Sequence, residues 1–558
     1  MEITASKTLY FSHWRQRSNR WFVMTFMITV LVAMPLSVII ANLAQPYSDT
    51  WQHLVDTVLA DYVKNSLTLM LGVAVGTFIL GTSTAWLTSM CRFPGRRLFE
   101  WALLLPMAMP AYIIAYTYTG MLEFAGPIQS ALRATFNWRY NDYWFPEVRS
   151  MGGAICMLSL VLYPYVYLIV RASFLQQSHA LLEVSRSLGN GPWQTFWRAA
   201  LPCARPAIVA GMTLALMETL ADYGTVQYFG INTFTTGIFR TWFGMGDLTA
   251  AAQLSSMLLI FIATLILVER YSRKRMRFHN ATAVQKRLPR LPISGLLALS
   301  CTLWCALPLC LGFVVPAGQL LIWATTTWQA NIDDGFVALV INSFGLAAVS
   351  SLLCLIIAVI LCFSLRLSNN GRFTSFMTRT ASMGYAVPGT VIAVGVLIAL
   401  AYIDGQLDTW LQASFNVSSG LLFSGTLFAV IFAYLVRFLS VAIQTLDSGY
   451  SKIRHSIDDS ARTLGHQPFM VLNKIHLPML KSSIIAALLL VFVDVLKELP
   501  TTLILRPFNF NTLAVRAYEL ASDERLIDAA TPSLAIVIVG LIPVLLLSRT
   551  ISQQQDNL

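Results

Sequence analysis

The segment Glu183-Val-Ser-Arg-Ser-Leu-Gly189-Asn-Gly-Pro192 recurs later in the chain as Asp459-Ser-Ala-Arg-Thr-Leu-Gly465-His-Gln-Pro468. The numbering of the two copies differs by a spacing of 276 (465 − 189), and Leu201-Pro202 recurs at the same spacing as Leu477-Pro478. Matches that repeat at one spacing are the mark of an internal duplication. The sequence therefore predicts one structural unit built twice.

Further matches extend the duplication over most of the chain. They pair Asn65-Ser66 with Asn342-Ser343, Glu218 and Asp222 with Asp494 and Glu498, and Arg240 with Arg516. The first of these pairs has a spacing of 277 (342 − 65), which implies one small insertion or deletion. We expect a first repeat over 1–270, a basic connector over 271–292 and a second repeat over 293–558.

The composition indicates that this duplicated unit lies in a membrane. Apolar residues make up 56% of the 558 residues and charged residues 12%, against about 25% charged in soluble domains. Apolar stretches long enough to cross a bilayer occur near 21–43, 64–90, 98–121, 151–171, 206–228, 249–268, 294–315, 338–364, 380–402, 421–442, 482–505 and 531–548. The expected fold is all-α and integral to the membrane, with about twelve transmembrane helices. Six crossings in each repeat leave the two repeats parallel.

The net charge of +11 follows the topology rather than a nucleic-acid partner. Basic residues cluster in the connector and before the first span, whereas the loops 44–60, 324–337 and 403–420 contain no Lys or Arg. By the positive-inside rule both termini are expected in the cytoplasm. We expect the first span to be retained rather than cleaved as a signal peptide, because its removal would leave an odd number of crossings.

Enzyme chemistry has little support in the sequence. The seven histidines fall outside the expected spans, and the chain has neither a nucleophile paired with a base nor a Gly-rich phosphate loop followed by Lys. No metal or cofactor site is therefore assigned, and ATP would have to be hydrolysed by another chain. The eight cysteines lie mostly within spans and are expected to be small buried thiols without disulfides.

The repeated segments fall in two loops, 173–205 and 443–481, which the topology places in the cytoplasm. Gly189 and Gly465 suit the left-handed residue that ends a helix, while Pro192 and Pro468 suit the first turn of the next helix. Each loop is thus expected to form a short helix–turn–helix. A single copy could be an ordinary amphipathic helix pair at the surface, but two equivalent copies favour a docking element for a two-fold partner.

These loops resemble the EAA loop of ABC-importer permeases, in which an acidic residue precedes Leu-Gly and Leu-Pro follows twelve residues later. The first copy has Glu-Val-Ser and the second Asp-Ser-Ala where that family has Glu-Ala-Ala. The resemblance implies the type I importer fold and coupling helices that contact two cytoplasmic ABC ATPase subunits, which bind ATP and Mg²⁺. It gives that coupling role to Glu183, Gly189, Asp459 and Gly465, with Asp459 the departure from the pattern.

Three longer stretches resemble the fused ferric-iron permeases within that superfamily. They are Ala221-Asp-Tyr-Gly-Thr-Val-Gln-Tyr-Phe-Gly230, Thr236-Gly-Ile-Phe-Arg240 and Lys497-Glu-Leu-Pro-Thr-Thr-Leu-Ile-Leu-Arg-Pro-Phe508. The likeness implies a bacterial inner-membrane permease that receives ferric iron from an extracytoplasmic iron-binding protein and works by alternating access. Permeases for thiamine, phosphonate or sulfate share parts of this frame and remain alternatives.

Four carboxylates inside the expected spans are candidates for the substrate pathway: Glu218, Asp222, Asp494 and Glu498. Ionisable residues in a membrane are costly and tend to be functional, and a hard cation prefers oxygen ligands. The spacing i, i+4 would put each pair on one helix face. The alternative is structural: pairing with Lys497, Arg240, Arg506 or Arg516, or capping of helices broken near Gly224 and Pro500.

A rival class is an ion-coupled secondary transporter, which can also have two parallel sets of six spans and a basic central loop. Such a transporter has no need of the paired Leu-Gly and Leu-Pro loops. A membrane enzyme or receptor is the third possibility.

Overall fold

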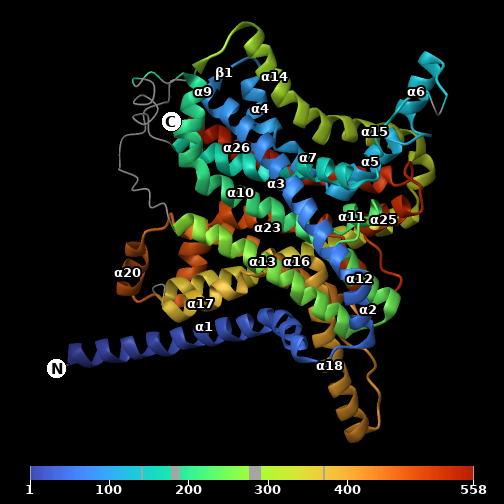
Figure 1. The fold of residues 1–558 in the computed structure, drawn as a ribbon. Helices are drawn as coiled ribbons and strands as arrows, with labels where there is room; N and C mark the ends of the chain where they lie inside the picture. Colours follow the sequence, from blue (N-terminus) through green and yellow to red (C-terminus); the bar gives the residue numbers. More distant parts are fainter. Residues whose placement is uncertain are drawn as a thin grey trace. The chain divides into compact units, whose positions relative to one another are not determined.

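The computed structural model describes residues 2–139, 142–176, 187, 189, 191–274, 291–368 and 371–556. Nearly all of this backbone is helical, as the composition predicts (Figure 1). In the described ranges the single sheet has two short parallel strands, β1 (Cys91–Arg92) and β2 (Leu291–Pro292). The backbone N–H of Ile293 continues this pairing by donating to the carbonyl of Arg92. The segment that follows the basic connector is thereby hydrogen-bonded to the residues just after the helix Leu59–Met90.

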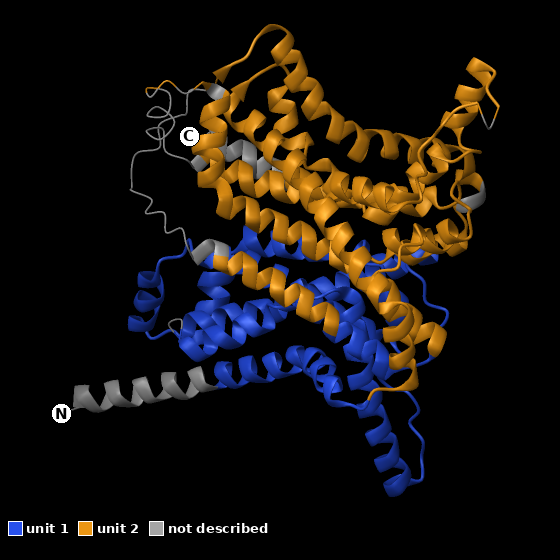
Figure 2. Ribbon diagram, viewed as in Figure 1, with its two compact units in different colours: residues 1–46, 246–256, 338–512 blue, residues 47–245, 257–337, 513–558 orange. Residues whose placement is uncertain are grey.

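The chain folds into two compact units (Figure 2). Unit 1 comprises residues 1–46, 246–256 and 338–512, and unit 2 comprises 47–245, 257–337 and 513–558. Each unit contains the first hydrophobic helix of one repeat and the central helices of the other. These compact units do not follow the sequence repeats. The limits of the repeats, 1–270 and 293–558, rest on similarity of sequence and stay a prediction.

Unit 1 is built on the central helices of the second repeat. Its elements are α1 (Glu2–Ala41), η1 (Asn42–Ala44), α16 (Asp334–Leu367), α17 (Arg372–Ala381), η5 (Gly384–Ala386), α18 (Gly389–Phe415), α19 (Leu427–Tyr450), α20 (His455–Thr463), α21 (Pro468–Val471), η6 (Leu472–His476), α22 (Leu477–Met479), α23 (Lys481–Leu496) and α24 (Pro500–Leu505). Helix α1 packs along α17 and α18 (Figure 1). A Cβ at Gly395 would lie 2.5 Å from the carbonyl oxygen of Pro35, so α1 and α18 approach closely at this glycine.

Unit 2 is built on the central helices of the first repeat, with α3, α7 and α10 packed against one another. Its elements are α2 (Asp49–Thr57), α3 (Leu59–Met90), α4 (Arg96–Ala102), η2 (Leu105–Ala108), α5 (Ala111–Leu122), α6 (Pro127–Phe136), α7 (Met151–Gln176), α9 (Pro192–Thr195), η3 (Phe196–Ala200), α10 (Leu201–Ala221), α11 (Gly224–Tyr228), α12 (Phe234–Met245), most of α13 (Leu248–Lys274), α14 (Gly295–Leu309), η4 (Cys310–Val314), α15 (Val315–Asn331), α25 (Leu513–Ser522) and α26 (Ala530–Asp556).

The described helices agree with the expected membrane spans in number and place. Nine are long and apolar enough to cross a bilayer, and two bent pairs raise the number to eleven. A shorter apolar helix, Ala530–Leu546, falls where the last span is expected. The bent pairs are Arg96–Ala108 with Ala111–Phe136, at 90°, and Pro468–Met479 with Lys481–Leu496, at 78°.

Three expected spans prove to be interrupted rather than continuous, and a fourth, 380–402, becomes a continuous helix only from Gly389. The span 98–121 breaks between α4 and α5, where Pro106 and Pro110 remove backbone donors. The spans 206–228 and 482–505 end early, at Ala221 and Leu496, and resume as the short helices α11 and α24. Both of these later interruptions coincide with an acidic residue of the candidate pathway.

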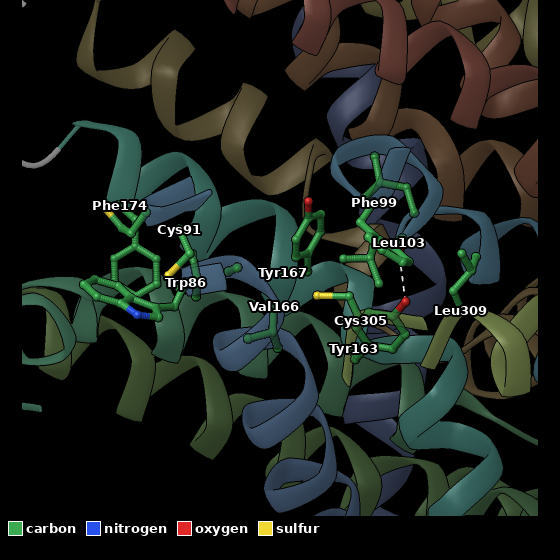
Figure 3. Close-up of a cluster of buried hydrophobic side chains, with 14 of the residues drawn as sticks. Trp86, Cys91, Phe99, Leu103, Tyr163, Val166, Tyr167, Phe174, Cys305 and Leu309 are labelled. Carbon is green, nitrogen blue, oxygen red and sulfur yellow. Dashed lines mark hydrogen bonds between the residues drawn. The ribbon is translucent and has the colours of Figure 1, made fainter. Parts of the chain in front are cut away.

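A hydrophobic cluster in unit 2 holds the ends of α3, α4, α7 and α14 together (Figure 3). The hydroxyl of Tyr163 donates to the carbonyl of Leu103 across 2.9 Å inside this cluster. Cys91 and Cys305 are buried in it, and burial raises the pKa of the Cys91 thiol to about 12. All eight cysteines are free, as expected, but Cys156 and Cys310 are exposed rather than buried. Both lie on apolar helix surfaces, where a thiol can face lipid as a small apolar group.

Candidate coupling loops and carboxylate sites

The repeated loop of the second half forms the expected helix–turn–helix. Helix α20 ends in a Schellman motif, in which Gly465 N–H donates to the carbonyl of Arg462 and His466 N–H to that of Ala461. Gly465 has φ of +83°, the left-handed conformation that glycine adopts without a Cβ clash. Pro468 opens α21 as expected. The predicted turn is confirmed here.

In the repeated loop of the first half, the equivalent glycine has the same backbone φ. Gly189 also has φ of +83°, and Pro192 opens α9. A Cβ at Gly189 would meet no atom within 4 Å, so the backbone conformation rather than lack of space calls for glycine. Glu183, the acidic residue expected to contact an ATPase, lies outside the described residues.

Large apolar side chains are exposed at equivalent positions of the two loops. Trp193 is 69% exposed, and Phe469, its equivalent in the second repeat, is 67% exposed. One turn further on, the equivalent residues Phe196 and Leu472 are buried. Each loop therefore buries one of these side chains and leaves the other exposed.

Two adjacent acidic residues of α20, in the second loop, have different surroundings. Asp459, which matches the EAA pattern, is 70% exposed at its side chain and lies 3.8 Å from Arg462. Its neighbour Asp458 is buried and accepts from Arg366 and His476, each across 2.6 Å. Sequence reasoning missed Asp458 because its first-repeat equivalent is Leu182, so the repeat gave it no weight.

Asp222 lies just beyond the end of α10 and caps the short helix α11. One carboxylate oxygen accepts from the backbone N–H groups of Thr225 and Val226, both across 3.1 Å, and the other from the Thr225 hydroxyl at 2.9 Å. These are the bonds of a helix N-cap. Asp222 thus satisfies the backbone donors that the interruption exposes.

Glu498 occupies the equivalent place in the second half and adds an ion pair. Its Oε1 accepts from the backbone N–H of Thr501 at 3.2 Å and from the Thr501 hydroxyl at 2.5 Å. Arg437 of α19 donates from Nη1 to the same oxygen across 2.9 Å, and both charged side chains are deeply buried. Gly389 makes room for the pair, since a Cβ there would overlap with the guanidinium.

Arg437 is a partner that sequence reasoning missed. The expected partners, such as Lys497 and Arg506, were residues close to Glu498 in the chain, whereas Arg437 comes from another helix. A signal was available: Arg437 is an arginine in the middle of an expected span, and charged residues in such places pair with one another.

The remaining two pathway candidates lie on the helices before the breaks. Asp494 in α23 pairs with Lys497 across 2.8 Å, as the structural alternative proposes. Glu218 is half-buried in the last turns of α10. Because α10 ends at Ala221 and α23 at Leu496, neither pair shares one continuous helix face, which corrects the expectation from the i, i+4 spacing. Glu218 and Asp222 belong to unit 2, Asp494 and Glu498 to unit 1, and a ring of all four stays a prediction.

Metal-ligand clusters are not seen in the part of the chain that the structure describes, where no three His, Cys, Asp or Glu residues are grouped to hold a metal ion. Asp222 and Glu498 instead accept hydrogen bonds from the protein.

Comparison with known proteins gives the same duplication. The family described as "binding-protein-dependent transport system inner membrane component" matches the chain twice, over residues 77–278 and 355–556. The chain is similar to the Fe(3+)-transport system permease protein FbpB 2 of Haemophilus influenzae, with 28% identity over 88% of this chain and 90% of that protein. It is also similar to the sulfate transport system permease protein CysT of Escherichia coli, with 25% identity over 37% of this chain and 72% of that protein. The molybdenum transport system permease protein ModB of the same species shows 26% identity over 33% of this chain and 72% of that protein.

Proposed function

Because this chain belongs to the family of binding-protein-dependent transport system inner membrane components, we propose that it is the membrane subunit of an ATP-driven importer of ferric iron. The observation that supports the coupling role is the equal φ of Gly189 and Gly465. One of these glycines lies in each of the two loop elements, by which we mean the repeated loops 173–205 and 443–481. A rigid element repeated in both halves fits a partner that is itself two-fold. Two cytoplasmic ABC ATPase subunits would meet these requirements.

The coupling mechanism follows from the exposed and buried sides of these elements. Trp193 and Phe469 would enter clefts on the two ATPases, while Phe196 and Leu472 transmit movement into the helices that follow. Closure of the ATPases on ATP would push the two elements together and open the transport path outward. An extracytoplasmic binding protein would then release its cargo into the path. Both termini would be cytoplasmic in this arrangement.

Ferric iron is the substrate that the similarities support best. The ferric permease of H. influenzae matches nearly the whole chain, whereas the sulfate and molybdenum permeases match about the length of one repeat. The candidate pathway also has the acidic character that a trivalent cation needs on leaving water. An anion such as sulfate or molybdate would be repelled by the same side chains.

The carboxylates are not equivalent in this proposal. The charge of Glu498 is offset by Arg437 at 2.9 Å, and that of Asp494 by Lys497 at 2.8 Å. Asp222, whose hydrogen bonds come from the uncharged groups of Thr225 and Val226, is therefore the carboxylate that we expect to contribute more to attraction of the cation. Glu498 and Asp494 would set the shape of the path.

Uptake of competing substrates tests the assignment. Cells that produce the chain with its partner proteins, but lack other iron importers, are given radioactive ferric ion with excess unlabelled sulfate, molybdate, thiamine or 2-aminoethylphosphonate. We expect iron uptake that none of the four reduces and that stops when the chain is deleted. Uptake of radioactive sulfate or molybdate by the same cells, without iron uptake, would assign the chain to an oxyanion importer.

A further inference from the structure

Unit 1 contains a buried network of three polar side chains, Arg366, Asp458 and His476. Arg366 Nε donates to Asp458 Oδ2, and His476 Nε2 lies against Asp458 Oδ1, each across 2.6 Å. The three residues are 9%, 7% and 1% exposed. A charged pair and an imidazole are thus closed off together from solvent.

The network joins the two ends of the second loop to the end of a long helix. Arg366 lies in the last turn of α16, and its other guanidinium nitrogens donate to the backbone carbonyls of Tyr450, Ile453 and Arg454 at 2.9–3.2 Å. Those carbonyls belong to the turn that leads from α19 into α20. Asp458 lies in α20 itself, and His476 lies in η6, just before Leu477-Pro478 leads towards α23. One guanidinium therefore fixes the entry of the loop element, and through Asp458 its exit.

The charges of this network balance when His476 is neutral. Its ring lies edge-on between Phe363 and Tyr450, with centroids 5.5 and 5.4 Å away. Such apolar surroundings favour the uncharged imidazole, which donates from Nε2 to the carboxylate. Arg366 and Asp458 then form a buried pair of zero net charge.

A pair of this kind adds little stability compared with apolar side chains, because the cost of removing two charges from water nearly cancels their attraction. What it adds is a fixed geometry. The guanidinium has donors in fixed directions, and here four of its hydrogen bonds reach named acceptors of one loop.

In the described part of the first half, aromatic side chains lie at the equivalent place. There Trp86 packs against Phe174 and Phe196, with ring centroids 5.4 and 5.0 Å apart. The equivalents of Tyr450 and His476 are Phe174 and Ala200, at the common spacing of 276. By sequence, the equivalent of Asp458 is Leu182, which is outside the described residues. By sequence, the first half thus has no equivalent of Asp458 or His476, and the network of these two residues with Arg366 belongs to the second half.

We propose that Arg366, Asp458 and His476 are positioning residues that lock the second loop element to α16, so that movement of the loop is passed to the membrane helices. The second loop element is held to α16 by directional hydrogen bonds from Arg366. This inference rests on the proposed coupling to an ATPase.

The test separates coupling from folding. The full complex is purified through a tag on this chain, the amount of ATPase that co-purifies and its hydrolysis rate are measured, and uptake of radioactive ferric ion is measured in the same cells. Arg366→Lys keeps the charge but loses the fork of donors. We expect it to retain the ATPase yet lower iron uptake per ATP hydrolysed by about tenfold, the range of ordinary coupling energies. Arg372→Met, which removes an exposed arginine at the start of α17, is the matched control and should leave the ratio unchanged.

A second variant distinguishes a structural role. The triple variant Arg366→Met, Asp458→Leu, His476→Ala makes the joint apolar, with the first-half residues at the last two positions. We expect wild-type abundance but a ratio as low as that of Arg366→Lys. A normal ratio in Arg366→Lys, or full uptake by the triple variant, would overturn the inference. A wild-type chain that retains no ATPase would instead overturn the proposed function on which it rests.

Discussion

Gly189 and Gly465 occupy equivalent positions of the two repeats, one in each repeated loop, and share a φ of +83°. The duplication thus extends from the sequence to the backbone conformation of single residues. A left-handed glycine fixes the direction in which the next helix leaves. Both loop elements therefore present their exposed apolar side chain, Trp193 or Phe469, from the same local geometry.

The pair formed by Glu498 and Arg437 predicts that single and double variants behave in opposite ways. Glu498→Gln or Arg437→Met leaves one buried charge without its partner, which destabilises a protein by about 3–5 kcal/mol. We expect each to accumulate poorly in the membrane and to unfold at lower temperature. The double variant removes both charges and should recover much of the abundance. Wild-type stability in either single variant would show that the pair does not form.

Asp222 allows charge and capping to be separated. Asn can accept the same hydrogen bonds from Thr225 and Val226, whereas Ala cannot and loses about 1 kcal/mol of cap stability. We expect Asp222→Asn to reach wild-type abundance and Asp222→Ala to fall below it. If the charge also serves the cation path, Asp222→Asn should show lower iron uptake per molecule. Full uptake by well-expressed Asp222→Asn would remove Asp222 from the path and leave it as a cap.

The contrast with Glu498 changes an expectation that the duplication alone suggests. Two-fold symmetry predicts equal defects for Asp222→Asn and Glu498→Gln. The structure gives Glu498 a cationic partner in Arg437, so we expect the loss of its charge to lower abundance and the loss of the Asp222 charge to lower specific uptake. Measured uptake divided by permease level separates the two effects.

Topology gives a prediction that is independent of the substrate. A reporter domain inserted after Arg277, in the basic connector outside the described residues, should be active only in the cytoplasm. One inserted near Asp408, in the second half of α18, should be active only on the external side. The opposite result at either site would contradict the arrangement of spans and the cytoplasmic placement of the two loops.

Local features of this chain were predictable from sequence, and non-local ones were not. The turns at Gly189 and Gly465 follow from residues next to them, and the spans follow from length and hydropathy. The breaks after Ala221 and Leu496 were less accessible, because an apolar run gives no sign of where hydrogen bonding stops. Gly224 and Pro500, with the nearby acidic residues as caps, were the sequence signals of these breaks.

The packing of α1 in unit 1 shows why the rest was hidden. A helix that is apolar on all sides can face lipid or any neighbour, so its sequence does not select the second repeat as its partner. The contacts of Arg437 with Glu498 and of Arg366 with Asp458 are hidden for a related reason. Each joins helices whose paired residues are far apart in the chain, by 61 and 92 positions, and no local pattern records such a pairing.

The claim that the two loop elements connect this permease to an ATPase is tested most directly by the double variant Gly189→Val, Gly465→Val. A β-branched residue strongly resists the positive φ that both glycines adopt, so both turns should lose their geometry while the spans remain intact. The measurement is the amount of ATPase that co-purifies with the tagged chain from membranes, together with iron uptake in the same cells. We predict wild-type abundance of the double variant, loss of the co-purifying ATPase and loss of uptake. A double variant that retains the ATPase and takes up iron at the wild-type rate would contradict the account.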